Sequence, residues 1–497
     1  MSLDSPNSSS SFKRRTLIGF ILAILTMMAT KFLTLLSQWI IGFYLEPQEF
    51  GEYGIILGLL AFFGAFQEPG IGRIHTQLRA AAGNMWRRSI IVSAFLGVFG
   101  ATAMCLASSL IYGIDSRVTL MALIVALAFP VFGLANLLKA KLEILEDYRT
   151  LAAEQFLRGF LTNVLLVAAV LVGFSSYSFS LSLTLAVVIS SMYMFYKTNR
   201  VSNLKIASMD DYEPYSKVVV WSLVGAILLS MSIRSDYFVL SLTLDEYALG
   251  LYYFGFMVST NVGILLTQAI RSILMPAFSS IGSDVTKSEY FFKSCRYLLF
   301  FTSFLSVAAI ILLPSAIHFL WQGRWDEATI ICQVFILSLP LRLLTPLSLA
   351  YLESIGEWKI RAVSLAIDGI SLMIFCYVGA VLGGLIGAVV SCTVQRGIFG
   401  LVPFFIANHI AERKTEQDKS RKLHVDLLLY YGFMLLLVVN YQFFYDGKGI
   451  SSYLIDSYPL IFGVFLLFSV VFSRDLYRDT FRSFATQLSF GLRKIKA

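Results

Sequence analysis

The chain has 497 residues, of which 57% are hydrophobic and only 14% are charged. Soluble globular domains carry about 25% charged residues, so this composition excludes a soluble protein and indicates an integral membrane protein. The net charge of +8 would suit a nucleic-acid partner. However, the basic residues lie in short loops between apolar segments, where Lys and Arg determine membrane topology. We therefore expect membrane lipids, and no nucleic acid, as partners.

The first apolar segment follows a Ser-rich stretch and a basic cluster, Lys13–Arg15. Residues 1–15 are expected to form a disordered tail, because polar Ser-rich segments bury too little apolar surface to fold. The cluster and the run after it imitate a secretory signal peptide. The run from Leu17 to Phe43 exceeds the usual apolar core of about 7–15 residues and lacks a clear cleavage site, so we predict a retained first helix.

A bilayer core requires about 20 apolar residues per helix, and fourteen segments are candidates to cross it. They are 17–43, 53–67, 89–112, 118–138, 156–173, 179–196, 218–242, 250–270, 297–320, 329–350, 362–382, 384–407, 425–445 and 459–473. The predicted fold class is an all-α polytopic membrane protein. Its weakest points are the short second segment and the tight turn at Gly383–Gly384, which separates the eleventh segment from the twelfth.

The basic residues support this topology. If both termini are cytoplasmic, 32 of the 39 Lys and Arg residues lie on the cytoplasmic side, three lie outside and four lie within the apolar segments. Such a bias, kept through every alternation, is the positive-inside pattern. The longest outer loop has about 13 residues, which leaves no room for a catalytic domain outside the membrane.

A weak internal repeat relates Phe50–Tyr53 to Leu249–Tyr252, 199 residues later. Both follow an acidic turn and open the next apolar segment, and an even number of helices separates them, so the two halves have the same orientation. The expected domains are a tail (1–15), a six-helix lobe (16–200), a cytoplasmic loop (201–217), a second six-helix lobe (218–408), a cytoplasmic loop (409–424), two further helices (425–473) and a basic cytoplasmic tail (474–497).

Three passages resemble a known family. They are the stretch from Lys13 to Arg73, with its LEPQEFGEY element; RSDYFVLSLTLDEYALGLYYFGFMVS, from Arg234 to Ser259; and ILMPAFSS, from Ile273 to Ser280. They are similar to polysaccharide transporters, the Wzx-type O-antigen, capsule and exopolysaccharide flippases, of the multidrug/oligosaccharidyl-lipid/polysaccharide (MOP) exporter superfamily. The resemblance covers about residues 1–410. It implies a MATE-like fold of two six-helix lobes around a central cavity, in a bacterial inner membrane, and transport of an undecaprenyl-pyrophosphate-linked oligosaccharide by alternating access.

Four basic residues interrupt the apolar segments: Lys31, Arg234, Arg342 and Arg396. A Lys or Arg at the centre of a membrane helix costs roughly 2.5–3.5 kcal/mol on insertion scales and usually marks a polar pathway. We predict that the four cations line a cavity that receives a pyrophosphate, since Arg offers a fork of donors and Lys a compact charge. The alternative is an ion pair that joins helices, either Arg234 with Asp236 or Arg396 with Asp368. Residues two apart on a helix point in different directions, so the first is a poor pair.

Other polar residues of the apolar segments could serve transport. Candidate sites for H⁺ or Na⁺ coupling are Asp236, Asp368 and Glu68, although Glu68, at an inner helix end, also suits a solvated cap. Candidate contacts for sugar hydroxyls are Gln38, Asn261 and Gln268, for which hydrogen bonds between helices are the alternative. The five cysteines show no metal-ligand spacing, and no nucleophile or phosphate-binding loop is found. We therefore predict no metal, no cofactor and no catalytic residue.

Three rival functions differ from a glycan flippase. A MATE-like drug antiporter should carry acids that bind cationic substrates, whereas this chain places four bases in its apolar segments. A lipid II-type flippase has a similar cargo and is barely distinguishable by sequence. A polysaccharide polymerase or ligase would require a large outer loop. The preferred interpretation is a non-enzymatic carrier of a polyprenyl-pyrophosphate-linked glycan, with polysaccharide polymerase and chain-length machinery as further partners.

Overall fold

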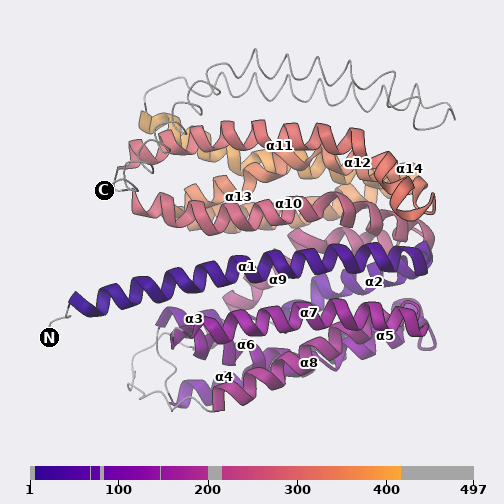
Figure 1. Cartoon of the computed structure of the whole chain (residues 1–497), viewed down its shortest axis with the longest axis horizontal. Coiled ribbons are helices and arrows are strands. Elements are labelled where there is room, and N and C mark those ends of the chain that lie inside the picture. The colour runs from indigo at the N-terminus through magenta and orange to yellow at the C-terminus, as the bar shows by residue number, and fades with distance from the viewer. Residues whose placement is uncertain are drawn as a thin grey trace, which may run out of the picture. The chain divides into compact units, whose positions relative to one another are not determined.

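The structure, a computed structural model, describes residues 6–67, 69–78, 83–145, 147–199, 215–281 and 283–415 (Figure 1). The regular elements within these ranges are all helices. They are α1 (Pro6–Tyr44), α2 (Pro47–Phe63), η1 (Gly64–Phe66), α3 (Ile71–Leu78), α4 (Gly83–Tyr112), α5 (Arg117–Ala126), α6 (Phe129–Ile144), α7 (Tyr148–Val172), α8 (Tyr177–Asn199), α9 (Tyr215–Ser241), α10 (Glu246–Ser280), α11 (Asp284–Trp321), η2 (Asp326–Ala328), α12 (Thr329–Leu337), α13 (Leu339–Ser354) and α14 (Trp358–Thr415).

The predicted all-α polytopic fold is confirmed. Within the described ranges, eight helical segments are long and apolar enough to cross a membrane, or nine if the bent pair α12–α13 forms one span. The expected segments 425–445 and 459–473 lie outside those ranges, so the count of fourteen stays a prediction. One expectation is wrong in part: α1 begins at Pro6, so residues 6–15 are helical where a disordered tail was expected.

Local sequence explains where individual helices begin and end. Glu46 and Glu49 form a capping box at the start of α2, in which the Glu49 carboxylate accepts a 2.8 Å bond from the Glu46 N–H. Asp147 caps α7 through the N–H of Thr150 at 3.2 Å. At its other end α7 stops at Gly173, whose φ of 93° is in the left-handed region that favours glycine.

Proline and glycine interrupt the long apolar segments. Pro340 follows the 41° bend between α12 and α13, and Pro130 follows the break between α5 and α6. Proline removes a helix hydrogen bond and clashes with the carbonyl four residues earlier, so both breaks are expected at these places. In α14 the helix is broken at Gly383 and Gly384, as predicted from the glycine pair.

The chain divides into two compact units. Unit 1 comprises Met1–Phe254 and Leu365–Ala388, and unit 2 comprises Gly255–Ser364 and Val389–Ala497. These units cross the boundaries of the expected lobes at 16–200 and 218–408, whose division stays a prediction. In unit 1, α7 packs against α1 and α8, and α2 packs against α9. The core of unit 2 includes Phe291, which stacks on Tyr351 at 4.7 Å between ring centroids.

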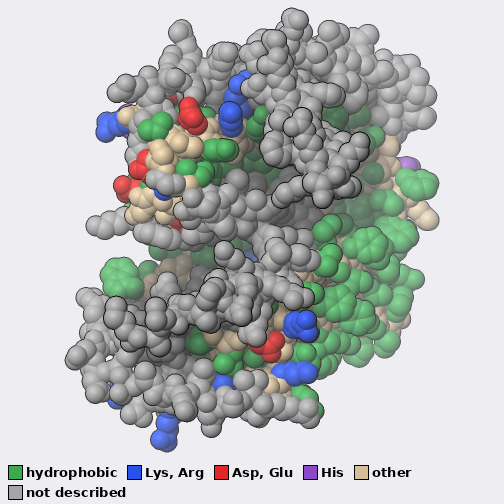
Figure 2. Space-filling model, turned by 60° about the vertical axis from the view of Figure 1, so that its left-hand side comes forward, with side chains coloured by type: hydrophobic (Ala, Val, Ile, Leu, Met, Phe, Trp, Pro, Cys, Tyr) green, Lys and Arg blue, Asp and Glu red, His purple; other side chains and the backbone are tan. Residues whose placement is uncertain are grey.

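Large apolar side chains form a continuous area on the described part of the face that Figure 2 shows. Leu110, Phe319 and Leu382 are each more than 80% exposed. A soluble monomer rarely exposes continuous apolar areas of this kind, whereas lipid tails solvate them. The chain is therefore a multi-pass membrane protein.

Candidate functional site

The four predicted cations occur as two pairs. Lys31 on α1 and Arg234 on α9 belong to unit 1, and Arg342 on α13 and Arg396 on α14 belong to unit 2. The first pair lies on helices that are far apart in the sequence, whereas α13 and α14 follow each other directly. We describe each pair within its own unit.

Lys31 and Arg234 form the pair of unit 1. Lys31 is half-buried and Arg234 is exposed, and their charges repel each other electrostatically. Two like charges in an apolar surrounding destabilise each other unless an anion joins them. Whether this pair serves an anion is taken up under the proposed function.

The helix that carries Lys31 has a polar side that packs inside unit 1. The Ser37 hydroxyl donates to Asn163 Oδ1 of α7 at 2.6 Å, and Asn163 Nδ2 donates to Thr34 Oγ1 at 3.3 Å. Thr34 follows Lys31 by three residues and therefore lies on the same helix face. These bonds fix the rotation of α1 against α7, since a polar pair in lipid has few other partners. Gln38, a candidate sugar contact, is half-buried on the next turn.

Asp236 lies two residues after Arg234 and faces the interior. Its side chain is 0% exposed, and its Oδ2 accepts a 2.8 Å bond from the Tyr252 hydroxyl. Arg234 is exposed, so the two side chains point in different directions, as their spacing predicts. Tyr252 belongs to the internal repeat and was not predicted as a partner. Its neighbouring ring, Tyr237, lies 5.7 Å away in an edge-to-face arrangement.

Asp368, in the first part of α14, also contacts α9. The Ser232 hydroxyl donates to its Oδ2, and Ser235 donates to the Gly369 carbonyl at 3.5 Å. The Cβ that Gly369 lacks would lie 3.1 Å from the backbone N of Ser232, so glycine permits this close approach. The two candidate coupling acids of the described residues therefore share one helix: Asp236 belongs to α9, and Asp368 contacts it.

Arg342 and Arg396 form the pair of unit 2 and share one aromatic ring. The guanidinium carbon of Arg396 lies 4.8 Å from the ring centroid of Phe256, and that of Arg342 lies 5.8 Å from it. Arg396 is 5% exposed and Arg342 is half-buried. A cation over a ring is stabilised by about 2 kcal/mol or more when it is desolvated. The Phe256 ring of α10 thus contacts one guanidinium group from α13 and one from α14.

Close helix packing supports this arginine pair. Thr345, one turn after Arg342, donates to the Gly400 carbonyl at 3.1 Å, one turn after Arg396. The missing Cβ of Gly400 would lie 3.0 Å from the Leu341 carbonyl oxygen, so glycine lets α13 approach α14. On the other side, the Phe335 ring meets Phe256 at 5.5 Å and 88°. The ring is thereby fixed in its orientation.

Three predicted residues are not placed by the structure. Glu68 lies outside the described residues. Asn261 and Gln268 lie on α10, but their side chains are outside the described part. Within the described ranges, no group of three or more His, Cys, Asp or Glu residues could hold a metal ion.

Sequence reasoning missed Phe256 and Tyr252, the partners of the predicted charged residues. Both lie on α10, four residues apart, and hence on one helix face. An aromatic face on a helix that follows a charged transmembrane helix could have indicated them. Aromatic residues are frequent in membrane helices, however, and the pattern alone does not distinguish a cation partner from core packing.

Comparisons with known proteins agree with this architecture. The chain is similar in structure to a multidrug resistance MATE family transporter of the MOP superfamily in an inward-facing conformation, with a TM-score of 0.61 and 17% identity, covering 78% of this chain and 96% of that one. It is also similar to the lipid II flippase MurJ in an inward closed conformation, with a TM-score of 0.67 and 14% identity, covering 92% and 99%.

A third similar structure is a MOP superfamily transporter from Pyrococcus furiosus, described by a reverse polarity of its binding pocket that suggests a different function (TM-score 0.56, 17% identity, covering 79% of this chain and 95% of that one). Curated proteins gave no match. The family described as "Polysaccharide biosynthesis protein" matches residues 43–330, which is more than half of the chain. The chain therefore belongs to the polysaccharide biosynthesis protein family and has the fold of MOP-superfamily transporters.

Proposed function

We propose that this protein is a flippase that moves an undecaprenyl-pyrophosphate-linked oligosaccharide from the inner to the outer leaflet of a bacterial cytoplasmic membrane, with both termini in the cytoplasm. The cargo is an O-antigen, capsule or exopolysaccharide repeat unit. The observation that carries the proposal is the arginine pair at Phe256. Two guanidinium groups on membrane helices suit a pyrophosphate, because each presents a fork of donors to phosphate oxygens.

The pair of Lys31 and Arg234 supports the same cargo. Its mutual repulsion is relieved when an anion binds. Neither pair needs to bind the headgroup tightly, because a carrier must also release its cargo. No chemistry on the cargo is required, so the protein acts as a carrier rather than an enzyme.

The reaction cycle that we propose is alternating access. The pyrophosphate and sugars enter from the cytoplasmic side, the conformation changes, and the headgroup leaves outside while the prenyl chain stays in lipid. Asp236 and Asp368, with Glu68, are the proposed sites for H⁺ or Na⁺ coupling. Gln38, Asn261 and Gln268 are the proposed contacts for sugar hydroxyls. The polymerase and chain-length machinery would receive the product.

A lipid II-type flippase is the second candidate, since its cargo is also a polyprenyl-pyrophosphate-linked sugar. The similarity to MurJ favours it at the level of the fold. A drug antiporter is the weaker candidate, because basic residues repel cationic drugs. The description of the Pyrococcus furiosus transporter indicates that the same fold can carry binding pockets of opposite polarity.

Complementation tests the proposal and separates the first two candidates. The gene is expressed in strains that lack an O-antigen, capsule or exopolysaccharide flippase, and in a strain depleted of its lipid II flippase. We expect rescue of one glycan-export defect. Arg396→Gln should abolish that rescue at equal protein level, whereas Lys293→Gln, an exposed basic residue on α11, should not. Rescue of the lipid II strain alone would identify lipid II, and not a repeat unit, as the cargo. Full rescue by Arg396→Gln would refute a role for the pair of Arg342 and Arg396.

A further inference from the structure

A buried carboxyl group on α2, that of Glu52, takes no part in the site described above. Its side chain is 8% exposed. The topology expected from the basic residues places the start of α2 at the outer membrane surface, together with the loop before α5 and the turn before α8. Glu52 is thus buried close to the outer solvent. An ionisable residue inside a membrane helix usually marks a functional site.

The ion pair of Glu52 is long and involves one oxygen only. Its Oε1 lies 4.0 Å from Nη1 of Arg117, which begins α5 and whose side chain is 64% exposed. This distance exceeds that of a hydrogen bond, and exposed ion pairs contribute little to stability. The other oxygen, Oε2, is fully buried and has no hydrogen-bond partner among the described residues. The charge of a carboxylate at this position is therefore only partly compensated.

Ser176 adds a second buried polar group at the same place. It lies in the turn before α8 and is 0% exposed. Its hydroxyl lies beside the Glu52 carboxyl group but not in the geometry of a hydrogen bond, and its Oγ has no partner within the described ranges. Two adjacent buried polar groups that make no bond cost free energy. A proton on Glu52 would supply a donor for the Ser176 oxygen.

Glu49, one turn earlier on α2, is compensated at both oxygens. Ser175 donates to its Oε1, and the Glu46 N–H donates to its Oε2 at 2.8 Å. Glu52 receives no such bond from the described part of the chain. The two acids of one helix turn therefore differ in role: Glu49 caps α2, whereas Glu52 is left able to take up a proton.

The charged groups that face Glu52 come from three helices. They are Arg117 of α5, Glu49 of α2 itself and Glu246 at the start of α10. The carbonyl oxygen of Glu246 would lie 1.8 Å from a Cβ on Gly51, so the start of α10 packs directly against the residue before Glu52. Two acids and one exposed base thus surround Glu52. The local field attracts a cation, of which the proton is the smallest.

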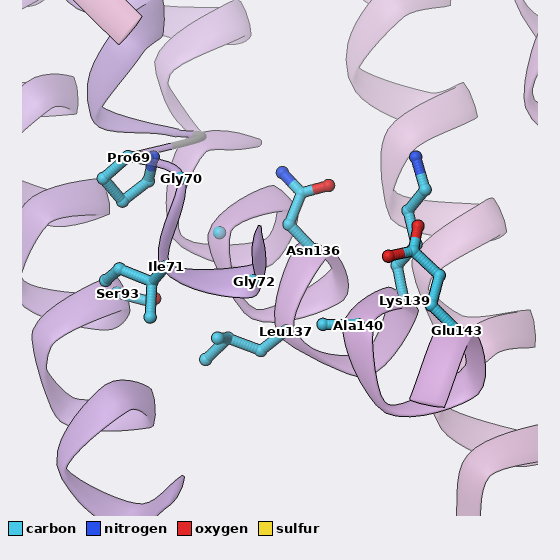
Figure 3. Close-up of a pocket in the computed structure, with 11 residues that line it drawn as sticks. Pro69, Gly70, Ile71, Gly72, Ser93, Asn136, Leu137, Lys139, Ala140 and Glu143 are labelled. Atoms are coloured by element: carbon cyan, nitrogen blue, oxygen red, sulfur yellow. The ribbon is translucent and has the colours of Figure 1, made fainter. Parts of the chain in front are cut away.

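A proton suits this place better than a metal ion. A metal ion would require several oxygen ligands, and no group of three or more His, Cys, Asp or Glu side chains in the described ranges could hold one. Figure 3 shows a cavity of about 140 Å³ in unit 1, between residues 69–72 and α6, and Glu52 does not line it. A proton requires no such cavity.

We propose that Glu52 is a proton-binding site at the outer end of unit 1. A proton from the outer solvent would form an O–H bond at Oε2, and the carboxyl group would become neutral. The new O–H would donate to Ser176. The neutral group would no longer attract Arg117, so the outer ends of α2 and α5 would lose their ion pair. In the flippase cycle the proton would provide H⁺ coupling from outside; this role, but not the site, rests on the proposed function.

Infrared titration of the full chain in nanodiscs tests the site. The stretching band of protonated carboxyl groups is recorded from acidic to alkaline pH. We expect a band that disappears as the pH rises and that is absent in Glu52→Gln. Asp115→Asn is the matched control, because it removes an exposed carboxyl group from the same outer surface and should leave this band unchanged. Arg117→Gln should keep the band and move its disappearance to a pH about half a unit higher, because it removes an exposed cation that favours the carboxylate.

Identical titrations of the wild type and Glu52→Gln would overturn the proposal. Loss of the band on addition of Na⁺ at constant pH would also overturn it, because the site would then bind a metal ion. If Glu52→Gln does not fold, Arg117→Gln is compared with Arg324→Gln, which removes an exposed arginine from the loop before η2. Equal titrations of these two variants would overturn the site. The measurement needs no cargo, so this proposal and the flippase proposal can fail separately.

Discussion

The guanidinium groups of Arg342 and Arg396 lie over the same ring, that of Phe256, at 5.8 and 4.8 Å from its centroid. Two like charges at one ring repel each other, and the negative face of the ring offsets part of that repulsion. For the pyrophosphate that we propose as cargo, the ring would keep both donors in place before binding. Preorganisation of this kind favours binding because less side-chain entropy is lost on association.

The shared ring makes the first prediction. Phe256→Leu should reduce glycan export about fivefold or more, because each cation–π contact contributes about 0.5–1 kcal/mol or more. Phe256→Tyr should retain most of the export, since its ring is kept. The measurement is export in a complemented strain at equal protein level. Phe319→Leu, which removes an aromatic ring that is 81% exposed, is the control and should behave as wild type. Normal export by Phe256→Leu would show that the ring has no part in transport.

Arg396→Lys separates charge from geometry. Lysine keeps the charge but loses the planar fork and the stacking on the ring, so it does not replace arginine at such a site. We expect export between that of wild type and that of Arg396→Gln. An Arg396→Lys variant equal to wild type would indicate that charge alone suffices there.

Because Lys31 and Arg234 repel each other, we expect their neutralisation to affect stability and export in opposite directions. Neutralising either residue, as in Lys31→Gln or Arg234→Gln, removes the repulsion and should raise the melting temperature of the purified protein or leave it unchanged. The same variants should export less glycan. Thermal unfolding in detergent and export at equal protein level are measured together. Variants that lose both stability and export would indicate a structural role instead.

The bond between Tyr252 and Asp236 makes a prediction for stability alone. Tyr252→Phe leaves a fully buried carboxylate oxygen without its 2.8 Å donor, and hydrogen bonds to charged groups contribute about 1.5–3 kcal/mol. Tyr112→Phe is the matched control, because its hydroxyl has a neutral partner, Ser241, at 2.8 Å. Its loss should cost about 0.5–1.5 kcal/mol. Equal melting temperatures of the two variants would contradict a stronger hydrogen bond at Asp236 than at Ser241.

The two glycines of the internal repeat make the last prediction. A Cβ on Gly51 would lie 1.8 Å from the Glu246 carbonyl oxygen, and a Cβ on Gly250 would lie 1.7 Å from that of Pro47. Either alanine variant must push α2 and α10 apart and should cost about 1–3 kcal/mol or more. Gly225→Ala on α9 meets nothing within 4 Å and should stabilise the helix by up to about 1 kcal/mol. Thermal unfolding of the three variants tests the difference.

This glycine contact shows what sequence could predict and what it could not. The repeat of Phe50–Tyr53 and Leu249–Tyr252 was visible in the sequence, but not that its two glycines pack against the opposite segments. Likewise, apolar length and Lys/Arg distribution predicted the helices, because the bilayer imposes both. The break at Gly383–Gly384 followed from local chemistry.

The site was less predictable than the fold. The sequence shows which residues are unfavourable in a membrane helix, but it does not show which residues they contact. Four cations in apolar segments are conspicuous from their insertion cost alone. Their arrangement in pairs depends on which helices touch, and Phe256 lies far in sequence from both arginines. Helix geometry already made the alternative ion pair of Arg234 with Asp236 a poor one, and in the structure Arg234 is exposed whereas Asp236 is buried.

The most direct test of an anion-binding role is the affinity of the purified protein for undecaprenyl pyrophosphate in nanodiscs. We predict that wild type binds it and that Arg342→Gln with Arg396→Gln weakens binding at least about tenfold, since each substitution removes a charged donor. Lys293→Gln should bind as wild type does. An unchanged affinity in the double variant, with the protein folded, would contradict the assignment of these cations to the pyrophosphate.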